Sequence, residues 1–528
     1  RNLKPHTPRD GQPDPHAHRA CQDRSLFSSL LGRAHPRTRG SRAPVTPGAR
    51  DASAADRAVY RERMRSRRPL RPGRAVAAAL LALTCALTAA PAGAAQPTGA
   101  ASSAVTVPDP FAALRPAPEH ERTPERYLPS PSPDPWYSSP PTVDPATAPG
   151  TILATREVTI PPHNVRNFGR GWQVLVQSTD SHDRPQQIVS TLIEPATPWP
   201  GPDPRPLVSF NVTIDSLGLT CMPSHTLPHT LNLELPPFLQ ILADRGYGLV
   251  VTDFQGPRAA YAAGRANGRA VLDGIRAARA FVPPGEAGPL FADSRVVQVG
   301  YSGGGIATGW AAQLQPVYAP ELTGVLVGSS VGGVPSDYSD LFDTMDGTIA
   351  SGLYRAAVLG LAREYPEMYP LLNATGDVIA HHLRDACAAA NTAGGLIPAP
   401  LSALTDVDPR TDPTVAAVLA RNRLGTPDPA HGADPREVPT GPVQVWHGDA
   451  AAPIGPGPGS SRGPGDPFVP EWTARRLADE WCAAGADVEY TPVPGEHILA
   501  AYTAVGPALD WVDDRARGVP FDSGCRPD

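Results

Sequence analysis

The chain has 528 residues, of which 66 are proline and 49 are glycine, and its formal net charge is −6. Residues 1–95 hold 18 Lys and Arg against 6 Asp and Glu, so residues 96–528 keep 28 basic against 46 acidic side chains, a net charge of −18. This excess of negative charge argues against nucleic acid and an anionic membrane surface as partners.

The first 95 residues have the composition of an export leader rather than of a folded domain. Residues 1–63 are rich in Arg, Pro and His without a sustained apolar period, so we expect a non-native or disordered upstream extension. Residues 64–95 combine a basic start after Met64, an apolar run over 75–90 and an Ala92-Gly93-Ala94 cleavage site, which predicts a secretory signal peptide. The Arg67-Arg68 pair also resembles a twin-arginine signal, which leaves the export route open. We expect a secreted, extracellular protein.

Four cysteines follow this leader: Cys221, Cys387, Cys482 and Cys525. An even number of cysteines in an exported chain predicts two disulfides, for which three connectivities exist. Their spacing matches no metal site, and we expect neither a metal nor a cofactor.

Globular patterning begins after a proline-rich segment. Residues 96–150 are dense in Pro, Ser and Ala and predict a linker followed by an extended, irregular N-terminal arm. Residues 151–160 alternate between apolar and polar side chains, as a half-buried strand does. Two further strands, 172–179 and 187–194, flank the polar residues 180–184 and predict a hairpin.

From residue 206 onward, strands and helices alternate. The expected elements are a strand at 206–213, a helix at 236–245, a strand at 247–253, a helix at 259–282, a strand at 295–301, a helix at 306–315 and a strand at 324–330. The strands are continuously apolar, which is typical of strands buried on both faces. This order predicts an α/β fold with a mainly parallel central sheet flanked by helices.

The pattern changes between residues 335 and 440. Ala- and Leu-rich helices are expected there without strands, at 346–363, 378–391 and 413–422. We interpret this segment as a helical cap or lid inserted into a catalytic domain formed by 151–334 and 441–528; simple decoration is the alternative. The sheet resumes at 442–448, followed by a helix at 472–484, a strand at 488–492 and a terminal helix at 498–516.

A serine flanked by glycines joins the strand at 295–301 to the next helix. Gly300-Tyr301-Ser302-Gly303-Gly304 fits the G-x-S-x-G nucleophile elbow in the strand–turn–helix context that this motif requires. Small residues are needed two positions before and after the serine because backbone and helix crowd there. The Gly303 amide, at the start of the helix, would point to a developing oxyanion.

A nucleophilic serine needs a general base and an acid that orients it, in the chain order Ser, Asp or Glu, His. His497 lies between the last strand and the last helix, where the base belongs, whereas His447 ends a strand, where a structural role is more common. Two carboxylates compete as the acid, Asp449 and Asp466, separated by a Gly- and Pro-rich insertion. We prefer Asp466 because it directly precedes the next helix, where the loop returns to the sheet edge.

At this point the chain resembles a known family. The resemblance is carried by residues 149–152 (PGTI), 215–224 (DSLGLTCMPS), 244–247 (DRGY), 270–276 (AVLDGIR), 300–304 (GYSGG), 318–322 (YAPEL), 332–335 (GGVP) and 496–497 (EH). These motifs, in this order, are similar to those of the secretory lipase family of the yeast lipase A type. They cover essentially the whole globular part of the chain.

The resemblance implies an α/β-hydrolase fold with a helical cap, a cofactor-free lipase or esterase activity and a lipid or ester substrate, with transient contact at a lipid interface. It implies that Asp215, whose alternative role is that of a turn residue, forms the oxyanion hole with Gly303. An ionised carboxylate would repel an oxyanion, so Asp215 would donate through its amide or as a protonated acid. It also implies disulfides Cys221–Cys387 and Cys482–Cys525.

Together these features predict a secreted serine hydrolase, most simply a triacylglycerol lipase acting through Ser302, Asp466 and His497. The alternatives on the same scaffold are a short-chain esterase, a polyester hydrolase, an acyltransferase or a peptidase. An exported binding protein without turnover is a further alternative. The chain length of the substrate does not follow from the sequence.

Overall fold

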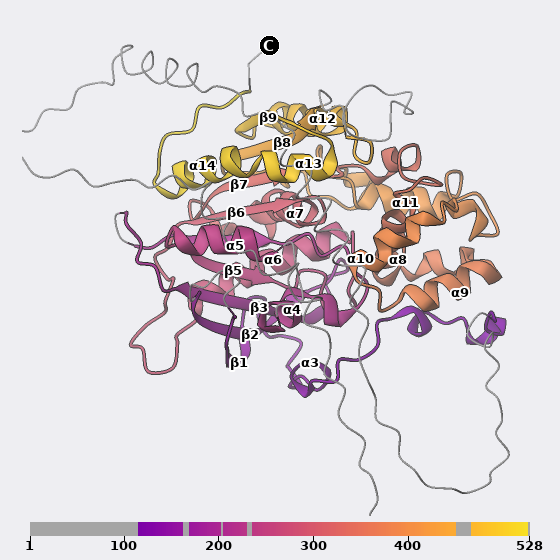
Figure 1. The fold of residues 1–528 in the computed structure, drawn as a ribbon, viewed down its shortest axis with the longest axis horizontal. Coiled ribbons are helices and arrows are strands. Elements are labelled where there is room, and N and C mark those ends of the chain that lie inside the picture. Colours follow the sequence, from indigo (N-terminus) through magenta and orange to yellow (C-terminus); the bar gives the residue numbers. More distant parts are fainter. Residues whose placement is uncertain (1–114, 162–167, 202–203, 230–234, 450–465, 526–528) are drawn as a thin grey trace, which may run out of the picture. The chain divides into compact units, whose positions relative to one another are not determined.

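The computed structural model describes residues 115–161, 168–201, 204–229, 235–449 and 466–525 (Figure 1). The expected upstream extension, the signal peptide, the first part of the proline-rich linker and the insertion at 450–465 lie outside the described residues.

The described strands form one nine-stranded sheet in the order β1-β2-β3-β5-β4-β6-β7-β8-β9. The first three pairs are antiparallel and the other five are parallel. The strands are β1 (Ile152–Val158), β2 (Gly169–Thr179), β3 (Pro185–Pro195), β4 (Leu207–Asn211), β5 (Gly248–Thr252), β6 (Val296–Tyr301), β7 (Leu326–Gly332), β8 (Val443–Asp449) and β9 (Val488–Pro494). The predicted mainly parallel α/β sheet and its leading hairpin are confirmed.

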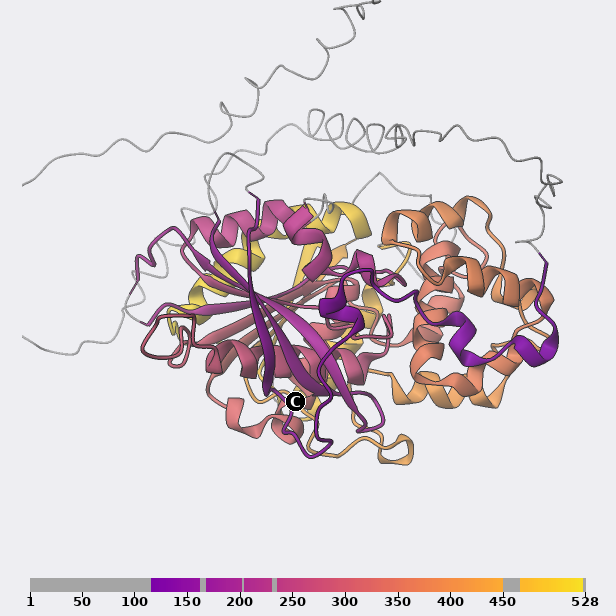
Figure 2. The same cartoon turned by 90° about the horizontal axis from the view of Figure 1, so that it is seen from below.

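Helices cover both faces of this sheet. On one face lie α5 (Leu235–Asp244) and α14 (Val505–Ala516), and on the other lie α6 (Gly264–Ala280) and α7 (Gly303–Tyr318), as Figure 2 shows. The helix α12 (Glu471–Ala483) packs beside α7, where its Trp481 indole donates a hydrogen bond to the Gln313 side chain at 3.0 Å.

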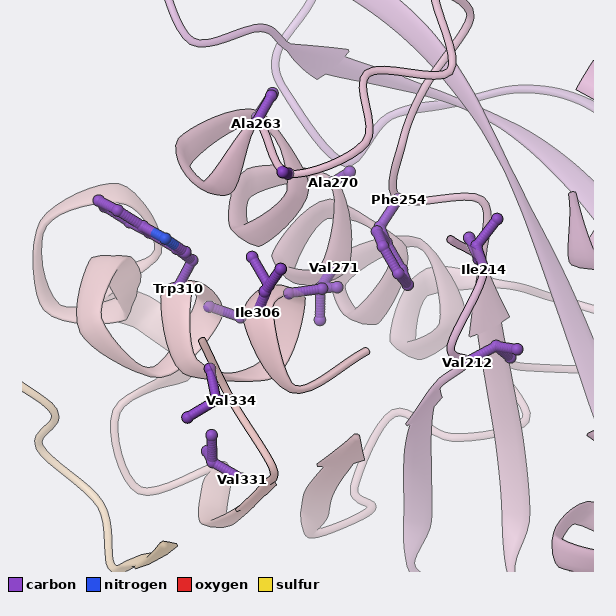
Figure 3. Close-up of a cluster of buried hydrophobic side chains, with 14 of the residues drawn as sticks. Val212, Ile214, Phe254, Ala263, Ala270, Val271, Ile306, Trp310, Val331 and Val334 are labelled. Carbon is purple, nitrogen blue, oxygen red and sulfur yellow. The ribbon is translucent and has the colours of Figure 1, made fainter. Parts of the chain in front are cut away.

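The central helices α6 and α7 pack closely because glycines face a tryptophan. A Cβ at Gly268 would lie 2.6 Å from the Trp310 carbonyl carbon, and a Cβ at Gly264 would overlap the Trp310 indole. Figure 3 shows Ile306 of α7 beside Val271 of α6, in the cluster of buried apolar side chains that supports the elbow. Substituting either glycine would therefore force the helix that carries the serine away from its neighbour.

The segment between β7 and β8 forms the helices α8 (Ser351–Glu364), α9 (Ala374–Leu383), α10 (Ala388–Ala393) and α11 (Pro413–Arg421), which gather beside the sheet in Figure 1. We refer to residues 335–440 as the cap. The N-terminal arm runs along it (Figure 2). Ala117 and Tyr127 donate hydrogen bonds to Asp377 at 2.8 and 3.0 Å, and Ser130 donates two bonds of 2.7 Å to Asp385. The arm is thus anchored on the cap by the buried Asp377 and the exposed Asp385.

Four predicted helices differ from the structure, of which the one expected at 346–363 begins only at Ser351. The helix expected at 259–282 begins at Gly264, because residues 256–263 form tight turns with Ala259 and Ala262 at φ 47° and 65°. The helix expected at 378–391 is interrupted between α9 and α10 where Cys387 forms a disulfide. The terminal helix divides into α13 (His497–Thr503) and α14, because Pro507 has no amide proton to donate to Thr503.

A buried carboxyl follows β5 on the sheet. Asp253 accepts hydrogen bonds from the Ser224 amide, at 2.9 Å, and from the Ser224 hydroxyl. Burial raises the pKa of Asp253 from 3.8 to about 7, against the lowering effect of these hydrogen bonds. At a pH between these two pKa values, Asp253 is ionised in the unfolded chain and protonated in the folded chain. Stability therefore falls as the pH rises from about 4 to 7.

We expect Asp253→Asn to remove this pH-dependent loss of stability. The uncharged asparagine side chain can accept a hydrogen bond from the Ser224 backbone amide and donate one to the Ser224 hydroxyl. The advantage of the variant in free energy of unfolding should grow by about 1.4 kcal/mol per pH unit between pH 4 and 7 and then level off. Denaturant unfolding of both proteins at pH 4, 5.5, 7 and 8 measures it. A difference that does not change with pH would contradict the protonated state of Asp253.

Candidate active site

The predicted elbow is a strained turn between β6 and α7. Ser302 has φ 53° and ψ −117°, a conformation that side-chain-bearing residues rarely adopt and that often marks functional sites. A Cβ at Gly300 would overlap the Gly304 carbonyl, and a Cβ at Gly304 would overlap the Asn211 carbonyl of β4. The glycines on either side are therefore required for the serine to project from this turn.

Ser302 begins a chain of three hydrogen-bonded side chains. The His497 Nε2 lies 2.9 Å from the Ser302 hydroxyl, and the His497 Nδ1 pairs with the Asp466 carboxylate. The second Asp466 oxygen accepts from the amides of Phe468, at 2.8 Å, and Val469, at 3.0 Å. The three residues, 164 and 31 positions apart in sequence order, thus meet at the carboxyl ends of β6, β8 and β9.

Local capping and stacking hold His497. It is the first residue of α13 rather than a loop residue, and the Glu496 side chain caps that helix by accepting from the amides of Ile498 and Leu499, each at 2.9 Å. The Tyr301 hydroxyl donates to the His497 carbonyl, and the Tyr301 ring stacks on Trp446 with the ring centres 4.9 Å apart. The sequence had marked Tyr301 only as the elbow residue that precedes the serine.

The neighbouring His447 supports the acid loop. Its Nε2 donates to the Val469 carbonyl at 2.7 Å and lies 3.5 Å from Asp466. Burial lowers the pKa of His447 despite the Asp466 charge, so this imidazole is neutral at pH 7. Its contacts are those of a residue that fixes the 466–470 turn.

The competing carboxylate, Asp449, ends β8. Among the described residues, Asp449 makes no hydrogen bond to His497, and its charge instead helps to raise the pKa of Tyr490. The geometry therefore favours Asp466 over Asp449 as the partner of the imidazole.

The charges of His497 and Asp466 shift each other's pKa. Burial alone would lower the pKa of His497, but the charge of Asp466, its hydrogen bond and the charge of Asp215 raise that pKa above 6.5. Burial alone would raise the pKa of Asp466, but the imidazole of His497, the nearby His447 and the Val469 amide hold it below 3.8. Asp466 is thus ionised at neutral pH and stabilises a positive charge on His497.

Asp215 lies beside the elbow. It follows β4 at φ 42°, and its carboxyl packs against Gly303, where a Cβ would overlap the Asp215 Oδ1. Burial, the Asp215 charge and a hydrogen bond to Asp215 raise the pKa of Tyr261 well above its ordinary value. As the first residue of α7, Gly303 has no acceptor within the helix for its amide. The structure therefore brings Asp215 and the start of α7 to the same side of Ser302.

A cavity of about 260 Å³ opens at these residues. Ser302, His497 and Asp215 line it, and most of its remaining walls are apolar. The cap contributes Leu353, Ala357 and Val358, among others, and the hydrolase part contributes side chains of β4, α5, α13 and α14. Such a cavity fits the hydrocarbon part of an ester, with its carbonyl next to the serine.

Both disulfides lie within the described residues. Cys221 pairs with Cys387, and Cys482 pairs with Cys525, with Cα–Cα distances of 5.5 and 5.4 Å. This is the connectivity that the resemblance implied. The first disulfide joins the segment after β4 to the cap, and the second joins α12 to the C-terminal segment.

Comparison with known proteins gives this geometry a family. The model of the secretory lipase family matches residues 229–524. The chain belongs to the secretory lipase family. This secretory lipase is 31% identical to lipase 4 of Candida albicans over 417 residues, which cover 75% of this chain and 84% of that lipase. It is also 31% identical to a secreted triacylglycerol lipase of Malassezia restricta over 413 residues, 75% of this chain and 81% of the relative.

Solved structures agree with the family. Lipase A of Candida antarctica superimposes with a TM-score of 0.65 at 28% identity, over 76% of this chain and 89% of that one. The cell-wall-degrading esterase LipA of Xanthomonas oryzae shares the fold, with a TM-score of 0.54 at 17% identity, over 70% of this chain and 100% of that one. The secretory lipase is thus an α/β-hydrolase and an enzyme that hydrolyses carboxylic ester bonds.

The family also bears on location and substrate. A lipase acts on lipid or ester substrates, and the family's name, together with the two disulfides, agrees with an extracellular protein. Within the described ranges, no helix has both the length and the apolarity to cross a bilayer. The same ranges contain no group of three or more His, Cys, Asp or Glu side chains arranged to hold a metal ion.

Proposed function

We propose that this secretory lipase is a secreted triacylglycerol lipase in which Ser302 is the nucleophile, His497 the general base and Asp466 the residue that orients the base. The observation that carries the proposal is the unbroken hydrogen-bonded chain from the Ser302 hydroxyl through His497 to Asp466. The side chain of Ser302 also faces an apolar cavity, as an acyl-transfer nucleophile for lipids should.

In the proposed mechanism, the His497 Nε2 takes the proton of Ser302 as the serine oxygen attacks the ester carbonyl. The oxyanion accepts hydrogen bonds from the amides of Gly303 and Asp215. His497 then gives its proton to the departing alcohol, which leaves an acyl group on Ser302. A water molecule, deprotonated by His497, attacks this acyl-enzyme; His497 then returns that proton to the Ser302 oxygen as the acyl–serine bond breaks and the carboxylic acid leaves. Asp466 stays ionised and holds the Nδ1 proton throughout.

The cap completes the proposed site. We infer that residues 335–440 act as the cap of the acyl-binding cavity, because five side chains of α8 line it: Leu353, Tyr354, Ala357, Val358 and Leu361. We also propose that residues 64–95 are a cleaved signal peptide, of the twin-arginine or the general secretory type. That segment lies outside the described residues, and the family's name supports an exported protein.

Hydrolysis of p-nitrophenyl esters from acetate to palmitate, and of a triacylglycerol emulsion, tests the proposal on the protein without residues 1–95. A fluorophosphonate probe, followed by peptide mapping, should label Ser302 and abolish turnover. An optimum at long chains and turnover of the emulsion are expected. An optimum at acetate would favour a short-chain esterase, and product esters formed only with added alcohol would favour an acyltransferase. Absence of both labelling and turnover would contradict the proposal.

The cavity makes a prediction about chain length. Ala357 lies on the wall that α8 contributes, so Ala357→Phe should fill part of the space that a long acyl chain would occupy. We expect kcat/KM for the palmitate ester to fall by about ten- to hundredfold, the range that mismatched apolar pockets produce, while the butyrate ester changes little. The ratio of the two kcat/KM values measures this effect. Equal losses on both esters would mean that Ala357 does not contact the acyl chain.

A further inference from the structure

The loop that follows β4 contains Asp215, Ser216 and Leu217. The cap, and not only the hydrolase core, holds this loop in place. The cap's Asn391 Nδ2 donates to the Asp215 carbonyl at 2.9 Å, and the Ala388 amide donates to the Ser216 hydroxyl at 2.9 Å. The Leu217 amide donates to the Ala386 carbonyl at 2.8 Å. Three consecutive residues of the loop are therefore bonded to one six-residue stretch of the cap.

Two further contacts bind the same pair of segments. The Cys221–Cys387 disulfide lies at the far end of the loop, and the guanidinium of Arg363, in α8, donates to the Leu217 carbonyl at 2.7 Å. A Cβ at Gly218 would lie 2.5 Å from the Asp385 carbonyl oxygen, which shows how closely the two backbones approach. Residues 385–391 thus cannot move away from the loop without breaking a covalent bond and several hydrogen bonds.

Asn391 contacts Asp215, whose amide is one of the two oxyanion donors in the proposed mechanism. Asn391 lies in α10 and is 1% exposed. Asp215 has a left-handed φ of 42°, a strained conformation that contacts with surrounding residues must stabilise. The Asn391 bond ends on the carbonyl of Asp215, so it fixes the orientation of the peptide that leaves this strained residue. The φ of Asp215 is the rotation about its N–Cα bond, so the strain acts directly on the orientation of the Asp215 amide.

We propose that Asn391 is a positioning residue of the oxyanion hole, so that the cap builds part of the catalytic centre as well as part of the acyl cavity. This inference rests on the proposed function, in which the Asp215 amide is one of two oxyanion donors. Without the Asn391 donor, the peptide that follows Asp215 can rotate; the strained φ of Asp215 then relaxes, and the Asp215 amide no longer points to the oxyanion. The ground-state ester does not need that donor, so the loss falls on kcat rather than on KM.

The matched pair of variants is Asn391→Asp and Asn422→Asp. Each keeps nearly the size of the original side chain, loses the amide donor and gains a carboxylate. Asn422 is also 1% exposed and also joins the cap to the hydrolase part, since it donates to Val418 at 2.9 Å and accepts from Gly264 at 3.1 Å, but it does not touch the loop. A general effect of a buried carboxylate or a loosened cap would therefore appear in both variants.

For Asn391→Asp we expect kcat on p-nitrophenyl butyrate to fall about 10- to 100-fold, somewhat less than the loss of a whole oxyanion donor, with KM within about threefold of wild type. Asn422→Asp should keep kcat within about threefold. The inhibition constant of an alkyl trifluoromethyl ketone, which forms an oxyanion on the serine, should rise by the same factor as kcat falls. Asn391→Leu, which removes the donor without adding charge, provides the same test if Asn391→Asp does not fold.

Unchanged kcat in folded Asn391→Asp and Asn391→Leu would overturn the inference. Equal losses in Asn391→Asp and Asn422→Asp would overturn it as well, and so would a lower kcat with unchanged affinity for the ketone. Ser302→Ala in the same assays separates this inference from the proposed function. If Ser302→Ala still turns over, the proposed function is wrong; if it is inactive and the Asn391 variants match wild type, only the inference is wrong.

Discussion

Ser302→Ala is expected to lower kcat for ester hydrolysis by about 10⁶-fold, close to the full catalytic effect of such a triad, because Ser302 carries the acyl group in the proposed mechanism. The residual rate would come from the oxyanion donors and from substrate binding. KM should change little, because the serine oxygen forms its bond to the substrate only as the reaction proceeds. Initial rates with p-nitrophenyl butyrate at high enzyme concentration measure the loss.

Two controls accompany this substitution. Thermal unfolding should be close to that of wild type, because alanine and serine meet the same strain at φ 53° and, among the described residues, the Ser302 side chain hydrogen-bonds to His497 alone. Labelling by the fluorophosphonate should disappear. Retention of more than about one hundredth of the wild-type rate, with the fold intact, would require another nucleophile and would contradict the proposed mechanism.

Asp466→Asn is expected to lower kcat by about 10⁴-fold, as a carboxamide in this position does in serine proteases. The amide would keep its carbonyl on the Phe468 and Val469 amides and turn its NH₂ toward the His497 Nδ1. The Nδ1 would then accept a hydrogen bond rather than donate one. The imidazole proton would move to Nε2, where it prevents His497 from accepting the proton of Ser302.

The same substitution should move the pH profile. The charge of Asp466 is a main cause of the raised pKa of His497, and activity is lost on the acid side as that imidazole becomes protonated. Removing the charge lowers the pKa of His497, so the acid limb of kcat/KM should shift to lower pH in the variant. Profiles between pH 5 and 9 show the shift, which a purely steric defect would not produce.

Asp449→Asn is the matched control for Asp466→Asn. Asp449 is the last residue of β8 and Asp466 follows that strand in the chain, but only Asp466 pairs with His497 among the described residues. We expect Asp449→Asn to keep kcat within about threefold of wild type and to leave the acid limb in place. If kcat fell further in Asp449→Asn than in Asp466→Asn, Asp449 rather than Asp466 would be the residue that orients His497.

Several features of this protein follow from the sequence because they depend on neighbouring residues. The strands and most helices have the apolar periodicity of their type, and the elbow has glycines where the turn around Ser302 leaves no room for a Cβ. The same local reasoning put His497 after the last strand, although it missed that Glu496 caps a helix beginning at that histidine. It also missed the helix break at Pro507, where the missing amide proton outweighs the apolar periodicity.

Other features were decided only by the tertiary structure. The sequence narrowed the partner of His497 to two carboxylates and preferred Asp466, but only the folded loop shows its hydrogen bond to the imidazole, because residues 450–465 separate the two candidates. The anchoring of the N-terminal arm on Asp377, and the bond from Asn391 to Asp215, join residues 176 or more positions apart. No pattern of neighbouring residues encodes such contacts, because they depend on how the chain brings distant segments together.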